Sequence, residues 1–457
     1  MTAPEAPGRR GVTVLLSPPP TPNGPLHVGH LAGPYVAADV AARAARLRGE
    51  RVLTVCGLDD HQNYVLAKAR QQGTKVREER DGHATRIREV FRRAGVRHDV
   101  FTDPLSDVAY RTAVAAFLDE LVTAGTVPVA EWETPVCRSC DGVAHHAYVG
   151  GDCPQCGAGS GGGTCEGCGW YTHAGNLVGA RCTRCGEELT ERRTVRGPVL
   201  PLEPYREGLC RIWAAADASP ATRVLLRQLL SLPELPVVPL DYPTDWGIES
   251  GTTPGHRIDV WAEMALGYLY TIGQRMRPGA SGIAGHVAAW RDVDALWAFL
   301  GRDNTFYYLV LFPALFLACG LPPDVMGGLV VNEFYRLSGL KFSTSRGHAV
   351  WAHELLERED SRALRAFLCW DRPAPHATNF TPERHHALTA GWDLDTPAGT
   401  EPEYAVERER AARALTLEHF DAALAARILL RPGGDPQLRG ALTGTTGAPA
   451  PEGVPGA

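Results

Sequence analysis

Apolar residues near the N-terminus alternate between short continuous runs and helically spaced positions. The run Val12-Thr-Val-Leu-Leu16 is apolar and ends at a triple proline, which predicts a buried strand that leads into a loop. Residues 27–49 carry apolar side chains at helical spacing, and residues 51–56 predict a second strand, followed by a helix from about Gln62. A strand–helix–strand order of this kind implies parallel strands and a doubly wound α/β fold.

The pattern changes towards the C-terminus. Apolar segments with helical spacing return over residues 203–330, as expected for a second half of the same α/β sheet. The longest apolar stretch, Phe306 to Leu321, contains Pro313 and is shorter than the ~18–20 residues of a membrane span, so it predicts a buried helix and no membrane contact. Beyond Pro373 we expect proline-rich turns, one helix within 401–430, and a disordered tail from Pro432.

Composition narrows the class of protein. The chain has 457 residues, 44% hydrophobic and 21% charged, which excludes disorder throughout and predicts two to four domains at ~100–200 residues each. A net charge of −6 excludes a global positive field for nucleic acid but leaves a local basic patch open. The N-terminus lacks the apolar core of a secretory signal, so we expect a cytoplasmic protein.

Cysteines are concentrated in one window. Eight of the 12 cysteines form four Cys-x-x-Cys pairs, namely Cys137/Cys140, Cys153/Cys156, Cys165/Cys168 and Cys182/Cys185. Two such pairs supply the four thiolates of one tetrahedral site, so the four pairs predict two structural zinc ions. The alternatives are redox-active pairs or accidental spacing, which the repetition disfavours.

Three further motifs carry candidate chemistry. The segment from Pro22 to His30 lies where the first strand turns into a helix, and a helix N-terminus attracts phosphate. Residues 57–61, Gly-Leu-Asp-Asp-His, follow the second strand, where ligands of doubly wound sheets bind. The loop 341–347 is small, polar and cationic, and can hold a triphosphate. Each motif alone is weak: on spacing alone the first favours an ordinary capped helix, and Asp59 or Asp60 of the second could cap the helix that follows.

In this order, the motifs resemble those of the class I aminoacyl-tRNA synthetases, most closely the methionine-specific family, over roughly residues 11–385. His27-Val-Gly-His30 matches the family's HIGH motif, and residues 57–61 resemble its Gly-Thr-Asp-Glu-His segment. Residues 245–248 and 260–268 resemble the stretches that border the amino-acid pocket, and 341–345 resemble a KMSKS loop. The resemblance implies a Rossmann-like, HUP-type nucleotide-binding domain with a zinc-knuckle connective insertion and a short helical C-terminal part.

The resemblance also implies a ligand or role for each site residue. The inner cysteine pairs, Cys153/Cys156 and Cys165/Cys168, would share one zinc ion, and the outer pairs, Cys137/Cys140 and Cys182/Cys185, the other. The expected catalytic residues are His27, His30, Lys341, Ser343 and Ser345. The expected ATP ligands, acting with Mg²⁺, are Asn23, Gly29, His30, Lys341 and Arg346. The expected amino-acid ligands are Thr21, Asp59, Trp261, Met264, Tyr268, Asn304 and Tyr308, with Asp59 on the substrate ammonium.

The sequence departs from the family pattern in the amino-acid pocket and in the loop. Thr21 stands where the family has a tyrosine, and Met264-Ala265 stands where it has Ala-Pro. Asn304 replaces an apolar residue of the family, and Tyr308 replaces a histidine. These changes add polar groups and refill the cavity, which predicts a small or polar amino acid; neutral drift around methionine is the alternative. Thr344 replaces the second lysine of the loop, a loss that commonly costs ~10²–10³ in rate.

The resemblance divides the chain into parts. We expect a first half of the catalytic domain (1–125), the zinc-knuckle insertion (126–200), the second half (201–330), the KMSKS-like loop with a stem-contact region (331–385), a short helical remnant (386–431) and the disordered tail (432–457). The family's anticodon-binding domain needs more chain than follows Pro373, which makes tRNA a doubtful partner.

Three functions of different classes follow. The leading hypothesis is an enzyme that activates an amino acid with ATP and passes it to a small nucleophile in specialised metabolism, for example in hydrazine formation with a separate zinc cupin partner. The second is a compact methionine–tRNA ligase of translation. The third, a non-catalytic zinc protein that binds nucleic acid, is disfavoured by the net charge and by the ATP motifs.

Overall fold

The computed structural model describes residues 11–342, 347–395, 404–431 and 434–446. Its centre is a five-stranded sheet in which every neighbouring pair is parallel. The strand order is β16-β15-β1-β2-β3, with β16 (Met326–Asn332), β15 (Val293–Gly301), β1 (Val12–Leu16), β2 (Val52–Gly57) and β3 (Val100–Thr102). The chain builds outward from β1 to one side and later to the other, so its winding reverses between β1 and β15. The predicted doubly wound α/β fold is confirmed.

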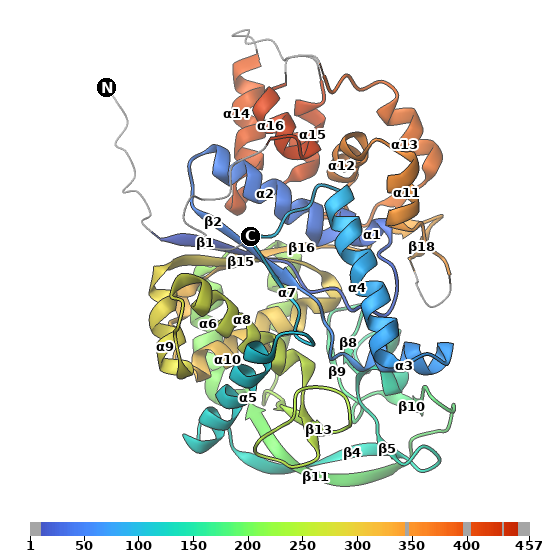
Figure 1. Cartoon of the computed structure of the whole chain (residues 1–457), viewed down its shortest axis with the longest axis vertical. Helices are drawn as coiled ribbons and strands as arrows, with labels where there is room; N and C mark the ends of the chain where they lie inside the picture. Colours follow the sequence, from blue (N-terminus) through green and yellow to red (C-terminus); the bar gives the residue numbers. More distant parts are fainter. Residues whose placement is uncertain (1–10, 343–346, 396–403, 432–433, 447–457) are drawn as a thin grey trace.

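Helices cover both faces of this sheet (Figure 1). Those between the central strands are α2 (Val36–Leu47), α3 (Asn63–Gln72), α4 (Val76–Arg93), α5 (Val108–Thr123), α6 (Arg206–Ala215), α7 (Pro220–Leu230), α8 (Val260–Met276), α9 (Gly282–Ala289) and α10 (Phe312–Ala318). Strand β1 shows why both faces are apolar. Val14 and Leu16 pack into the core that contains α5, α8 and α10, whereas Leu15 packs with Ala41 of α2 on the opposite face. Because side chains alternate along a strand, a continuous apolar run fits a strand that is buried on both faces.

The cysteine-rich segment forms an insertion between β3 and β15, at the lower end of the molecule in Figure 1. Its frame is the long antiparallel pair β4 (Val129–Cys137) and β11 (Glu191–Pro201). Shorter strands complete it, namely β5 (Gly142–Val143), β6 (Val149–Asp152), β7 (Gly159–Gly161), β8 (Gly163–Thr164), β9 (Tyr171–Thr172), β10 (Val178–Cys182) and β12 (Val237–Pro239). Two further strands, β13 (Asp241–Pro243) and β14 (His256–Ile258), pair just before α8.

The C-terminal part corrects two expectations. Residues 401–430 were expected to hold one helix, but the described residues there form α14 (Ala405–Ala414) and α15 (Ala422–Leu429). The tail from Pro432 was expected to be disordered, but its residues Pro436–Thr443 form α16. Further helices of this part are α11 (Ala352–Arg358), α12 (Ser361–Trp370) and α13 (Pro382–Thr389), beside the short strands β17 (Arg336–Leu337), β18 (Leu340–Lys341) and β19 (Asn379–Phe380).

The ordering of α16 has a physical cause that composition does not reveal. Arg365 is buried and donates from Nε to the carbonyl of Leu442 at 3.2 Å and from Nη2 to Asp39 Oδ2 at 2.6 Å. Arg43 of α2 donates to the carbonyl of Gly444 at 3.3 Å. Buried guanidinium groups need acceptors, and the carbonyls at the end of α16 supply them. The small residues of the tail therefore pack closely against α2 and α12 instead of remaining solvated.

The apolar stretch from Phe306 is buried, as the sequence predicts. It forms a π-helical turn over Tyr307–Leu311 that continues into α10, with Pro313 near the junction. Proline has no N–H to donate, and the carbonyl of Leu309, four residues earlier, accepts a hydrogen bond from Trp213 Nε1 at 2.7 Å. Among the described residues, no helix is long and apolar enough to cross a membrane.

Candidate active site and cysteine centres

His27 and His30 lie beside the carboxyl end of β1, where α1 (Val28–His30) begins the helix that continues into α2. Their rings stack with centroids 3.7 Å apart, and the backbone N–H of His27 donates to His30 Nδ1 at 3.1 Å. Phe342 stacks on His27 at 4.8 Å. Burial lowers the pKa of His30 to about 4 and also holds that of His27 well below its usual range, with Lys341 adding to both effects. Both imidazoles are therefore neutral hydrogen-bonding groups at pH 7.

Gly29 lies between the two histidines, where the surrounding rings leave no room for a side chain. A Cβ at this position would lie 3.0 Å from His27 Nδ1 and 3.5 Å from the ring of Phe342. A side chain here would displace the stacked rings, so this surface stays flat and open to a bound base. Asn23 lies in the preceding loop, where its backbone N–H donates to the carbonyl of Thr21 at 2.9 Å.

Asp59, at the carboxyl end of β2, is a buried carboxyl group that is only half satisfied. Its Oδ2 accepts a hydrogen bond from the Thr21 hydroxyl at 2.7 Å, whereas its Oδ1 is buried without a hydrogen-bond partner. Burial, with a smaller contribution from the carboxylate of Glu263, raises the pKa of Asp59 to about 7. A buried carboxylate of this kind is stabilised by a cation, and a substrate ammonium group matches that need.

The next two residues of the motif have structural partners. Asp60 receives two hydrogen bonds from Arg80, both at 2.7 Å, and His61 Nδ1 pairs with buried Glu263 at 2.9 Å. The pKa of His61 is raised by Glu263 despite its burial. The alternative in which Asp59 or Asp60 caps the following helix is wrong, because Gln62 is the N-cap of α3. These pairs hold the turn rigid and leave Asp59 as the member that faces the pocket.

The Asp59 pocket lies between β2, α5 and α8, and its lining includes Pro19, Cys56, Asp59, Thr102, Tyr110, Met264 and Tyr268. The hydroxyl groups of Tyr268 and Tyr308 are 2.8 Å apart, and that of Tyr308 lies 3.8 Å from Met264 Sδ. This network fills space beside the pocket with two phenol rings and a thioether. Asn304 instead donates to Asp303 Oδ1 at 3.2 Å, and Thr21 acts through Asp59, so the structure does not bring these two residues to the pocket lining.

Trp261 faces a different cavity. Its ring stacks on Tyr307 at 3.5 Å with an interplanar angle of 8°. Both residues line a cavity of about 340 Å³ between the insertion and the start of α8. We call it the aromatic cavity, after the rings of Trp132, Tyr171, Tyr242, Trp261 and Tyr307.

Lys341 lies on β18 at the described edge of the loop. Its ammonium contacts the carboxylate of Glu166 in the insertion and lies 4.1 Å from the centroid of the Phe334 ring. The positive charge of Lys341 acts on the two histidines, because it helps to lower the pKa of both His27 and His30. The expected residues Ser343, Ser345 and Arg346, and the substitution Thr344, lie outside the described residues.

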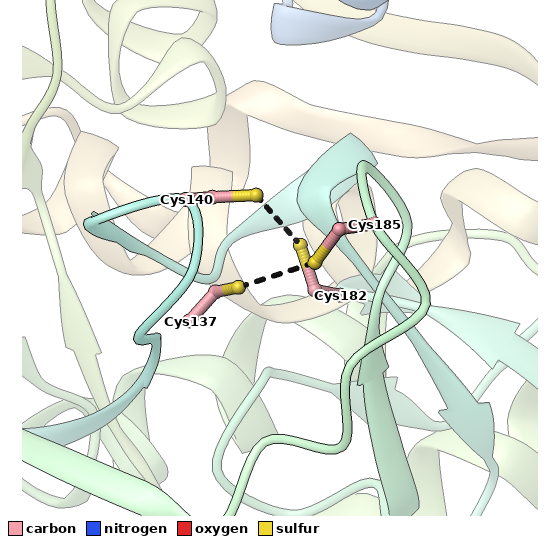
Figure 2. Close-up of side chains that lie close together, drawn as sticks. All are labelled: Cys137, Cys140, Cys182 and Cys185. Carbon is pink, nitrogen blue, oxygen red and sulfur yellow. Dashed lines mark hydrogen bonds between the residues drawn. The ribbon is translucent and has the colours of Figure 1, made fainter.

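The eight cysteines form two clusters, each with all four sulfur atoms within 4.8 Å of one another. The outer cluster has Cys137–Cys185 at 3.4 Å and Cys140–Cys182 at 3.9 Å (Figure 2). The inner cluster has Cys153–Cys168 at 3.8 Å and Cys156–Cys165 at 3.6 Å. None of these cysteines forms a disulfide. A tetrahedron of thiolates with metal–sulfur bonds of ~2.3 Å has edges of about 3.8 Å, so both clusters fit a metal ion, and the grouping predicted from the resemblance is confirmed.

Backbone turns shape these clusters. In three of the four knuckles a glycine directly follows the second cysteine, as in Gly157 and Gly186, and takes a positive φ of 73° and 79°. The N–H of that glycine donates back to the first cysteine of the pair, at 2.9 Å for Gly157. Because L side chains rarely adopt this conformation, the glycine fixes the tight turn that directs two sulfur atoms to one point.

Three parts of the site were not foreseen from the sequence. Glu263 pairs with His61, Glu166 contacts Lys341, and His146 Nε2 pairs with Asp259 at 2.5 Å. The partners in these pairs are 202, 175 and 113 positions apart. No local pattern signals a pair at such separation.

The parallel sheet, the paired histidines after its first strand and the lysine-bearing β18 have the arrangement expected of the class I synthetases. A family model described as "tRNA synthetases class I (M)" matches residues 13–389. The chain belongs to this family.

The relatives and the solved structures agree with this assignment. A methionine–tRNA ligase of Cytophaga hutchinsonii is 29% identical over 390 residues, which are 82% of this chain and 55% of that protein. Those of Roseiflexus sp. and of Dehalococcoides mccartyi strain BAV1 are each 31% identical, over 79% of this chain and 63% and 65% of theirs. The chain thus spans a little over half to two thirds of these relatives. The Mycobacterium tuberculosis methionyl-tRNA synthetase in complex with methionyl-adenylate has the same fold, with a TM-score of 0.67 and 16% identity over 95% of this chain and 89% of that one.

Proposed function

We propose that this protein activates an amino acid with ATP, forming an aminoacyl-adenylate and releasing pyrophosphate. The observation that carries the proposal is the unpartnered Oδ1 of Asp59, which lies in a pocket of the sheet's nucleotide-binding edge and needs a cation. The α-ammonium of an amino acid supplies that cation. It also places the substrate carboxylate towards His27 and His30, where the α-phosphorus of ATP would lie.

The reaction needs positioned charge and no general base. The amino-acid carboxylate attacks the α-phosphorus, the bond to the β-phosphate oxygen breaks, and pyrophosphate leaves. His27 and His30, which are neutral, donate hydrogen bonds to phosphate oxygens, and Gly29 leaves room for the base. We assign the pyrophosphate contact to Lys341, with Ser343, Ser345 and Arg346 as further ligands and Asn23 beside them. A Mg²⁺ ion, brought with ATP, would neutralise further phosphate charge.

We also propose that both cysteine clusters hold zinc. Four thiolates at tetrahedral spacing in each cluster support this choice over other metals. The Gly-rich segment between the inner cysteines has few apolar side chains, so the ions would supply much of its folding free energy.

The amino acid and the acceptor are two separate questions. The relatives are methionine–tRNA ligases, which supports methionine and tRNA as the substrates better than it supports the specialised-metabolism hypothesis. A cupin partner has no support from these relatives. One observation favours a second candidate acceptor, a small nucleophile: the aromatic cavity beside the Asp59 pocket is large enough for one. For the amino acid, the Tyr268–Tyr308–Met264 network favours a side chain smaller or more polar than that of methionine.

Amino-acid-dependent exchange of pyrophosphate into ATP tests the proposal, using all 20 amino acids and then charging of bulk tRNA. Exchange with at least one amino acid is expected, with a small or polar one faster than methionine. Absence of exchange with every amino acid contradicts the proposed activation. Fastest exchange with methionine, together with efficient charging of tRNA, establishes the methionine–tRNA ligase.

A further inference from the structure

A group of histidine and glutamate side chains outside the cysteine clusters lies between the end of α11 and α13. Glu359 directly follows α11, and His385 and His386 belong to α13. One ligand atom from each side chain, a carboxylate oxygen or an imidazole nitrogen, lies within 4.8 Å of the other two. The helices α11 and α13 and the strand β18 occupy the same part of the molecule (Figure 1). The fold thus brings three metal-binding side chains together across α12.

His385 is buried, yet neither of its ring nitrogens has a partner. Its exposed fraction is 1%, and both Nδ1 and Nε2 lack a hydrogen bond to any residue that the structure describes. The ring of Phe367 contacts it edge-on, with centroids 5.0 Å apart. Nδ1 lies 3.9 Å from Glu359 Oε2, which is too far for a hydrogen bond. Because a buried polar atom without a partner costs free energy, an ion between these two atoms would satisfy the nitrogen.

The carboxylate of Glu359 lies between the two histidines. Its second oxygen, Oε1, is 3.3 Å from His386 Nε2. Within the described part of the chain, Glu359 forms no ion pair with a lysine or an arginine. The side chain of Glu359 is 18% exposed and that of His386 is 62% exposed. The group is therefore anchored in the protein by His385 and open to solvent at His386.

The distances suit a divalent transition-metal ion. Zinc bonds of ~2.1 Å to nitrogen and oxygen place the ligand atoms of a tetrahedral site about 3.4 Å apart. The two edges at Glu359, 3.3 Å and 3.9 Å, are close to that value. The edge between the two histidines is at most 4.8 Å, and rotation of the exposed His386 side chain shortens it. Two imidazoles and one carboxylate favour zinc or a similar ion over Mg²⁺ or Ca²⁺, which prefer oxygen ligands.

Hydrogen bonds already order the backbone that carries these ligands. The N–H of Glu359 donates to the carbonyl of Leu355 at 2.9 Å, and the N–H of His385 donates to the carbonyl of Thr381 at 3.1 Å. Thr381 is the N-cap of α13, and its hydroxyl oxygen accepts from the N–H of Arg384 at 3.2 Å. Binding an ion therefore requires adjustment of side chains and none of the helices.

The group also lies next to the small sheet that carries Lys341. Strand β19 ends at Phe380, and only Thr381 separates it from α13. This strand pairs with β17, which in turn pairs with β18 through Arg336 and Lys341. An ion that joins α11 to α13 would therefore support the sheet from which Lys341 projects.

We propose that Glu359, His385 and His386 bind one divalent transition-metal ion of the zinc type, at a site separate from the two cysteine clusters. The three side chains supply two nitrogen atoms and one oxygen atom, and water completes the coordination. The ion joins the end of α11 to α13 and stabilises this part of the fold. The proposal goes beyond amino-acid activation and is independent of it, because its test requires neither ATP nor an amino acid.

Calorimetric titration tests the site directly. Protein without an affinity tag, with its cysteine clusters already loaded with zinc, is titrated with further ZnCl₂. We expect one additional equivalent to bind, and the thermal midpoint to rise by about 3 °C when free zinc exceeds the Kd about 100-fold. MgCl₂ at the same concentration should leave the midpoint unchanged. No additional equivalent of zinc, or an equal rise with MgCl₂, overturns the proposal.

Two variants locate the additional ion. His386→Ala removes an exposed ligand, and Glu359→Gln removes the central carboxylate, so each should weaken the additional equivalent at least tenfold and abolish the rise in the thermal midpoint. The controls are His376→Ala and Glu354→Gln, which change exposed residues outside the group and should bind zinc as the wild type does. Wild-type affinity in both site variants overturns the assignment.

A third variant separates a ligand role of His385 from a packing role. His385→Phe keeps a ring against Phe367 and removes both unpartnered nitrogens. We expect the variant to fold, with a thermal midpoint before zinc addition no lower than that of the wild type, and to show no response to added zinc. A response as large as that of the wild type shows that His385 is not a ligand and overturns the proposed site. If this variant does not fold, His386→Ala decides the question, because its side chain is exposed.

Discussion

The ammonium group of Lys341 contacts the carboxylate of Glu166, although the two residues are 175 positions apart. Glu166 lies between Cys165 and Cys168, within the inner cysteine cluster. The contact therefore connects the inner cysteine cluster of the insertion with β18, the strand that carries the lysine proposed to bind pyrophosphate. Through this contact the insertion can affect the position and the charge of Lys341.

Replacing this carboxylate tests the connection. Glu166→Gln removes the charge that competes with triphosphate for Lys341, so we expect the KM for ATP to fall by up to about fivefold, the scale of a partly exposed ion pair. ATP dependence of pyrophosphate exchange measures it, with Glu188→Gln, an exposed carboxylate of the outer knuckle region, as the control. A raised KM in Glu166→Gln shows instead that the carboxylate positions Lys341 for ATP.

Metal content is the second prediction. The wild-type protein should contain two zinc ions per chain, and Cys153→Ser should contain one, since three thiolates hold the ion poorly. The thermal midpoint should fall by about 5 °C or more, because the bound ion stabilises the folded insertion. Elemental analysis and calorimetry measure this, with Cys210→Ser, on the exposed side of α6, as the control. One zinc or none in the wild-type protein contradicts the two-site assignment.

The raised pKa of Asp59 makes a prediction about pH. Its folded-state value of about 7 lies above the unfolded value of ~3.9, so folding favours the protonated form, and this stabilisation is lost as pH rises from about 4 through about 7. Asp59→Asn should therefore raise the thermal midpoint at pH 8, relative to wild type, by about 4 °C more than it does at pH 5. Equal changes at the two pH values show that Asp59 is ionised in the free protein throughout.

The same group controls substrate binding in the opposite direction. An ammonium needs the ionised carboxylate, so kcat/KM for the amino acid should fall about tenfold per pH unit below about 7. Exchange measured from pH 5.5 to 8.5 at saturating ATP gives the profile. A flat profile for the wild-type protein places the ammonium elsewhere.

The side-chain end of the pocket is tested by Met264. Its thioether lies 3.8 Å from the Tyr308 hydroxyl and lines the Asp59 pocket, so Met264→Ala should enlarge the space for the substrate side chain. We expect the kcat/KM of methionine, relative to the preferred amino acid, to rise about tenfold. Met276→Ala, at the distant end of α8, is the control. A ratio changed by less than twofold places the side-chain pocket elsewhere.

Local sequence signals were sufficient for much of this structure. The apolar run 12–16 and the turn to His27 and His30 lie within 20 residues, and strand, loop and helix each have a periodic signature. The cysteine pairs predict two clusters because a Cys-x-x-Cys turn is itself a local unit. Their grouping came from the family resemblance and not from spacing.

Relations between distant segments were not available from the sequence. Glu263 contacts His61 only because α8 packs beside the end of β2, and no local sequence pattern near either residue predicts this contact. The composition of the tail predicted disorder, yet α16 is ordered by the buried guanidinium of Arg365. The aromatic cavity likewise joins rings from the insertion, α8 and the turn at 307–311, and depends on how these elements pack.

Adenylate formation at the His27–Asp59–Lys341 site is tested most directly by amino-acid-dependent ATP–pyrophosphate exchange in three proteins: wild type, His27→Ala and Lys341→Ala. His376→Ala, an exposed histidine, is the control. We expect exchange in the wild type and the control, and a loss of about 10²–10³ in kcat/KM for His27→Ala and for Lys341→Ala, because both side chains would act on the phosphates mainly in the transition state. Exchange of wild-type rate in both site variants, or no exchange in the wild-type protein with any amino acid, contradicts the proposed site.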